Sequence, residues 1–145
     1  MATKTYFFDG IAKWAKTQKV GKFGNYEVDA YLSDWTEFDA SGLQLKKKED
    51  EDGGVFVRFR RPDVQEIKGE LVKRGPPEVK LLVGEAGGKK VYEPFEGAVG
   101  NGSKCTFKIV VYDTKAKGKG HRWEALGVEE LIEYNPGEDT SEFPF

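Results

Sequence analysis

The sequence contains very little of the chemistry that most enzymes and metal sites use. Its 145 residues include one histidine, His121, and one cysteine, Cys105. A site with several histidine ligands therefore cannot form, and an internal disulfide is excluded, as is usual in a reducing, cytoplasmic setting. Strand alternation in KCTFKIVVY places Cys105 on the apolar face, where it would pack as a small hydrophobic side chain. We expect no catalytic residues, no metal and no cofactor.

Long apolar runs are also missing. A membrane-spanning helix needs about 20 consecutive apolar residues, and no uncharged apolar stretch of the chain approaches that length. The N-terminal MATKTYFFDG reaches an acid at Asp9 and has no apolar stretch of signal-peptide length. These absences predict a cytoplasmic protein that does not enter the membrane.

The residues that are abundant favour a β-rich domain. Aromatic residues make up 13% of the chain, and 18 glycines provide turns. Alternating patterns predict strands, and cap residues predict one short helix from Ser33 to Ser41. The strands are expected at 5–15, 25–32, 43–48, 54–61, 79–83, 104–112 and 122–133.

These elements predict an all-β fold with one short helix. A small closed or partly open barrel of five or more strands would remove the unpaired strand edges. Residues 62–103 are the least regular part of the pattern, because prolines and glycines interrupt them. We expect residues 1–135 to form the domain and residues 136–145, PGEDTSEFPF, to form a flexible acidic tail.

The strand GVFVRFRR carries the clearest signal for binding. Alternation directs Phe56, Arg58 and Arg60 to one face and the aliphatic side chains with Phe59 to the other. An exposed face of aromatic and arginine residues suits a stacked base with cations on the flanking phosphates. The alternative is an amphipathic sheet whose cations extend to solvent. Lys13 with Trp14 on the first strand, and further polar faces at Tyr31 and at 43–48, favour binding.

The loop DTKAKGKGHR adds a cluster of positive charge between two strands. Lys115, Lys117 and Lys119 alternate with small residues, and Tyr112 and Trp123 stand where the loop joins its strands. Lysines in this arrangement favour the binding of a polyanion, because each phosphate that they neutralise releases a counterion. The loop could instead be a solvated connection.

The candidate residues fall into two groups. Those predicted to stack on bases are Trp14, Tyr31, Phe56, Tyr112 and Trp123, of which Tyr31 and Trp123 could instead belong to the core. Those predicted to contact backbone phosphates are Lys13, Lys46, Lys48, Arg58, Arg60, Lys104, Lys108, Lys115, Lys117, Lys119 and Arg122.

The order of these features resembles the bacteriophage single-stranded DNA-binding proteins. The resemblance rests on GNGSK before an alternating strand, the lysine-glycine loop, the closing VEELIEY, the strands YEVDAYL and VFVRFRRP, and the acidic tail ending in Phe145. It implies an oligonucleotide/oligosaccharide-binding (OB) barrel. It also implies a non-enzymatic protein that coats single-stranded DNA, with little sequence preference, during phage replication, recombination or repair in the infected bacterial cell.

The resemblance also implies a role for the tail in docking replication or recombination proteins. The tail residues concerned are Glu138, Asp139, Glu142, Phe143 and Phe145. Two other functions remain open, an RNA-binding OB domain and a protein–protein adaptor with a barrel scaffold. The sequence does not decide between a monomer and a dimer.

Overall fold

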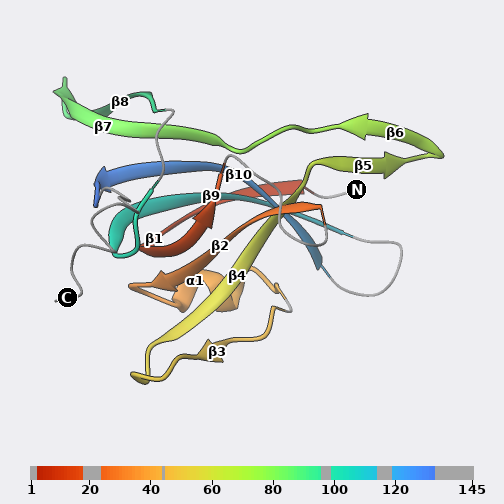
Figure 1. The fold of residues 1–145 in the computed structure, drawn as a ribbon, viewed down its shortest axis with the longest axis horizontal. Coiled ribbons are helices and arrows are strands. Elements are labelled where there is room, and N and C mark those ends of the chain that lie inside the picture. Colours follow the sequence, from red (N-terminus) through yellow and green to blue (C-terminus); the bar gives the residue numbers. More distant parts are fainter. Residues whose placement is uncertain (1–2, 18–23, 44, 96–98, 114–118, 133–145) are drawn as a thin grey trace, which may run out of the picture.

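The computed structural model describes residues 3–17, 24–43, 45–95, 99–113 and 119–132. Within them the chain forms ten strands and one five-residue helix (Figure 1). No helix in these ranges is long and apolar enough to span a membrane. The elements are β1 (Thr3–Lys16), β2 (Asn25–Leu32), α1 (Thr36–Ala40), β3 (Lys48–Glu49), β4 (Val55–Pro62), β5 (Val64–Ile67), β6 (Glu70–Lys73), β7 (Glu78–Ala86), β8 (Lys89–Pro94), β9 (Ser103–Asp113) and β10 (Lys119–Glu130).

Eight strands make one sheet in the order β3-β4-β2-β1-β9-β10-β7-β8, and β5 pairs with β6 alone. All neighbouring strands are antiparallel except β10 and β7. Figure 1 shows the β5–β6 and β7–β8 hairpins on one side of the central strands and α1 with β3 on the other. The prediction of an all-β fold with one short helix is confirmed.

The sheet curls until β4 approaches β10, but no backbone ladder joins these two strands in the described part of the chain. The predicted barrel is therefore not closed by strand pairing. Side chains make the connection: the backbone N–H of Arg60 donates to His121 Nε2 at 3.0 Å, and the Arg61 guanidinium donates to the carboxylate of Glu124 at 3.2 Å.

The core lies on the inner face of the curled sheet, where the alternation predicted it. The four inward-facing residues of β2, at 26, 28, 30 and 32, are buried. Cys105 and Phe107 of β9 are likewise buried, and burial raises the pKa of the Cys105 thiol to about 12. Phe59 stacks on Phe8 with ring centroids 6.0 Å apart. Cys105 is therefore a structural residue, as the sequence suggested.

Gly10 allows β1 and β2 to approach closely. A β-carbon at Gly10 would lie 2.3 Å from the carbonyl oxygen of Tyr31, closer than any real contact. A glycine at this position of β1 is thus required by the neighbouring strand in the sheet.

The structure differs most from the prediction in two segments. The expected strand at 43–48 is reduced to β3. The strand expected at 79–83 is present as part of β7, but β5, β6 and β8, which complete two hairpins around it, were not expected. Both hairpins turn on pairs of residues with positive φ, Lys68-Gly69 and Gly87-Gly88. Such pairs are typical of tight two-residue hairpins, because their twist matches that of the strands.

Candidate nucleic-acid interface

Trp14 is the most unusual residue on the surface. Its side chain is 64% exposed, and its backbone has a φ of 53°, a left-handed conformation that bulky residues rarely adopt. It lies at an irregularity of β1, between Lys13 and Lys16, where the register with β2 shifts. The backbone N–H of Trp14 donates to Asn101 Oδ1 at 2.7 Å, and this hydrogen bond holds the left-handed backbone conformation. Strain of this kind costs on the order of 1–3 kcal/mol and concentrates at functional sites.

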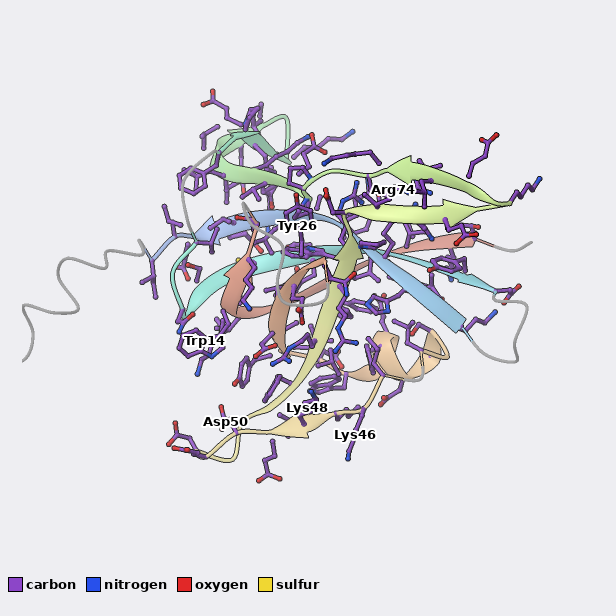
Figure 2. All side chains as sticks on the ribbon, turned by 45° about the vertical axis from the view of Figure 1, so that its right-hand side comes forward. Trp14, Tyr26, Lys46, Lys48, Asp50 and Arg74 are labelled. Carbon is purple, nitrogen blue, oxygen red and sulfur yellow. The ribbon has the colours of Figure 1, made fainter. Side chains whose placement is uncertain are left out.

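The indole borders a cavity of about 250 Å³ on the outer face of the sheet. We call it the Trp14 cavity; it is lined by Trp14, Lys16, Glu27, Asp29 and Arg58. Because β2 lies between β1 and β4, the two acids of β2 lie between Trp14 and Arg58. Figure 2 shows Trp14 at the periphery of the fold.

The two acids compensate the arginines of β4. Arg58 Nε donates to Asp29 Oδ1 at 2.7 Å, and Arg58 Nη2 lies 3.4 Å from Asp29 Oδ2. This hydrogen bond raises the pKa of Arg58. Glu27 Oε2 lies 3.7 Å from Arg58 Nε and 3.6 Å from Arg60 Nε. Arg58 and Arg60, which the sequence predicts as phosphate ligands, therefore both have acidic neighbours within the protein.

A second group of candidates packs together beside the cavity. Lys13 Nζ lies 4.7 Å from the centroid of the Tyr31 ring, and this ring is 5.0 Å from that of Phe56. Burial, followed by the nearby Asp50 carboxylate, raises the pKa of Tyr31 to about 12. Phe56 is only 9% exposed. The prediction that Phe56 offers an open ring to a base is therefore wrong, because Tyr31 covers it.

The candidates of the last two strands are mostly engaged within the protein. Trp123 has no exposed surface, and its Nε1–H donates to the carbonyl of Ala125 at 2.9 Å. The prediction that Trp123 stacks on a base is wrong. Lys119 pairs with Asp113, and Arg122 pairs with Glu124. Tyr112 is half-buried. Lys115, Lys117 and the tail residues Glu138, Asp139, Glu142, Phe143 and Phe145 lie outside the described residues.

The remaining lysines lie on separate parts of the surface. Lys46 and Lys48 are exposed beside β4, and Lys104 is exposed on β9. Lys108 borders a second cavity, of about 260 Å³, far along β1 from Trp14. The 58% exposed Phe7 also lines this cavity. The structure thus does not bring all the predicted phosphate ligands into one groove.

Several residues of the site were missed from the sequence. Glu27 and Asp29 share the outward face of NYEVDAYL with Tyr31, so alternation was sufficient to find them. Asn101 belongs to the quoted turn GNGSK, but its contact with Trp14 joins residues 87 apart in the sequence. No local pattern indicates that contact.

Comparison of the chain with protein-family models, with curated proteins and with solved structures finds no match. Among the residues that the structure describes, no group of three or more His, Cys, Asp or Glu side chains is arranged to hold a metal ion. The function is therefore inferred from the Trp14 cavity and its surroundings.

His121 connects β4 to β10 and should make folding sensitive to acid. Its ring packs edge-on against Phe59 at 5.8 Å, and its Nε2 accepts the Arg60 N–H. Burial, and secondly the charge of Arg60, lower the pKa of His121 from 6.5 to about 4. The neutral ring is thus the form that the folded protein holds.

We expect this group to reduce stability as the pH falls from 6.5 to 4. In that window the unfolded chain binds a proton on His121 that the folded protein does not, so the free energy of unfolding decreases by about 2–3 kcal/mol. His121→Gln keeps an acceptor for the Arg60 N–H but does not titrate, so its pH dependence should be shallower. Urea unfolding at several pH values measures both. Parallel curves for the two proteins would contradict the assignment.

Proposed function

We propose that this protein binds single-stranded DNA through the outer face of β1, β2 and β4. The observation that carries the proposal is Trp14, an exposed indole held in a strained conformation beside a cavity bordered by cations. A base–aromatic stack contributes about 1–3 kcal/mol and tolerates any base, because every base has a flat face. The hydrogen bond from the Trp14 backbone N–H to Asn101 holds the backbone that carries the indole before a base arrives, which lowers the entropic cost of binding.

The charges around Trp14 support a polyanionic ligand. Lys13 and Lys16 flank it on β1, and Lys46 and Lys48 are exposed near the neighbouring β4. The segment joining β1 to β2 contains further lysines, at 19 and 22. OB folds bind oligonucleotides on the face of their second and third strands and on two connecting loops. A comparable arrangement here would place the nucleic acid across β2 and β4.

The resemblance to phage single-stranded DNA-binding proteins extends the proposal. On that basis the protein acts without catalysis, coats DNA during phage replication, recombination or repair in the cytoplasm of the infected cell, and docks partner proteins through its tail.

Salt dependence of binding tests the proposal directly. If three to five phosphates are neutralised, the slope of log affinity against log salt should be about −2 to −3.5 for a strand of ~30 nucleotides. A duplex of the same length should bind at least about tenfold more weakly, because its paired bases cannot stack on Trp14. Fluorescence anisotropy with DNA single strand, duplex and matched RNA provides the three comparisons.

Each alternative gives a different result. Absence of binding to every nucleic acid at low salt would favour a protein–protein adaptor and reject the proposal. Tighter binding of RNA than of the matched DNA would favour an RNA-binding domain. Equal binding of single strand and duplex would indicate a general polyanion binder.

A further inference from the structure

We propose that the Trp14 cavity is a base-selective subsite that prefers guanine, through the carboxylate of Glu27. The inference rests on the proposed function, since it names the base that this site takes from an otherwise sequence-tolerant strand. Carboxylates line the centre of this site, which is unusual for a surface that binds a polyanion.

Among the described residues, no side chain or backbone group makes a close hydrogen bond to the Glu27 carboxylate. Its side chain is 15% exposed, and its nearest cationic atoms, Arg60 Nε and Arg58 Nε, are 3.6 and 3.7 Å from Oε2. These separations exceed a hydrogen bond, and no other described residue donates to this carboxylate. Asp29, in contrast, has both oxygens facing Arg58. Glu27 therefore has acceptor positions available at the cavity, since an ionised carboxylate offers about four.

A phosphate is a poor ligand for these positions. The negative charge of Glu27 would repel it, and the neighbouring arginines are already partly neutralised by the acids of β2. The complementary ligand is a flat ring that carries N–H donors. Among the bases, guanine offers two adjacent donors, N1–H and the N2 amino group. Cytosine and adenine offer one amino group each, and thymine offers one N–H between two carbonyl oxygens that would face the carboxylate.

The walls of the cavity favour the same ligand. Arg58 uses Nε and Nη2 toward Asp29, which leaves Nη1 to donate to the O6 of guanine. The Trp14 indole can lie against the face of the base, because aromatic side chains stack on flat rings. The volume of about 250 Å³ is below the roughly 300–1,000 Å³ of pockets for drug-sized ligands, so one base fits better than two.

The experiment compares short strands that differ only in the groups facing Glu27. The full chain is titrated at low salt with four octanucleotides: (dT)8 and the alternating strands in which every second thymine is guanine, hypoxanthine or cytosine. Hypoxanthine keeps the purine ring, N1–H and O6 of guanine but lacks the N2 amino group. Stacking is therefore matched, and the difference in affinity reports the amino group alone.

We expect the guanine strand to bind about fivefold more tightly than the hypoxanthine strand, the lower end for one good base contact, because the cavity is open to solvent. Glu27→Gln should bring the two strands within about twofold of each other, because an amide accepts less strongly than a carboxylate. Glu37→Gln removes one exposed acid from α1, outside the cavity, and should retain the fivefold difference.

Two results would overturn the inference while leaving the proposed function intact. One is equal binding of the guanine and hypoxanthine strands by the unmodified protein, a result that does not depend on whether the variants fold. The other is a guanine preference that persists in folded Glu27→Gln. Absence of binding to all four strands, and also to a strand of 30 nucleotides, would instead reject single-strand binding itself.

Discussion

Replacement of Trp14 by alanine should weaken binding of a 30-nucleotide single strand by about 5- to 150-fold, which is the 1–3 kcal/mol of one base–aromatic stack. The salt slope should stay the same, because the substitution removes no charge. Folding stability should change by less than about 0.5 kcal/mol, since the side chain is exposed and only its backbone N–H is bonded within the fold. Fluorescence anisotropy and urea unfolding measure the two effects separately.

Phe7→Ala is the matched control. Phe7 is an exposed aromatic residue of the same strand, but it lines the other cavity, beside Lys108. Its replacement should leave single-strand affinity within about twofold of the unmodified protein. Equal losses in both variants would mean that the interface extends along the whole of β1, and unchanged affinity in Trp14→Ala would remove the indole from the site.

Replacement of Trp123 by alanine should have the largest effect on stability. The side chain is fully buried, and large-to-small changes of a buried tryptophan cost about 3–5 kcal/mol. The indole N–H also loses its bond to the Ala125 carbonyl. Much of a small domain's stability of 5–15 kcal/mol would be lost, so reduced DNA binding would follow from unfolding rather than from a missing contact.

Urea unfolding distinguishes these two explanations, and Trp123→Phe provides the comparison. Phenylalanine keeps most of the apolar volume, so it should cost clearly less than alanine and retain binding while folded. A Trp123→Ala protein of normal stability that fails to bind single strands would show that this indole contacts the ligand, as the sequence first suggested.

The sequence was sufficient for the parts of the fold that depend on alternation alone. The strand at 25–32 and the buried face at Cys105 and Phe107 were predicted correctly, because one side of each strand is apolar and the other polar. The two hairpins between Val64 and Pro94 were not predicted. Their side chains are largely exposed, so the sequence lacks the alternation of apolar and polar residues that indicates a strand with one buried face.

The site was predicted less well, because its properties depend on pairs of residues from different strands. Alternation placed Phe56 on the face opposite Phe59, but the register of β2 with β4 brings Tyr31 over the ring and buries it. The same register sets Asp29 opposite Arg58 and neutralises a predicted phosphate ligand. The exposure of Trp14 depends on a left-handed backbone and on Asn101, neither of which has a local signature.

The pairing of β1 with β9 affects how the protein is made. Thr3 lies opposite Tyr112, and Ala12 lies opposite Ser103. About a hundred residues must therefore be synthesised after β1 before β9 is available to pair with it. At roughly 5–20 residues per second, the ribosome takes about 5–20 s to supply that partner. A two-stranded hairpin of β1 and β2 is at best marginally stable by itself. The aromatic strand β1 therefore stays available to chaperones until β9 has been synthesised, and the central part of the sheet assembles only after that point.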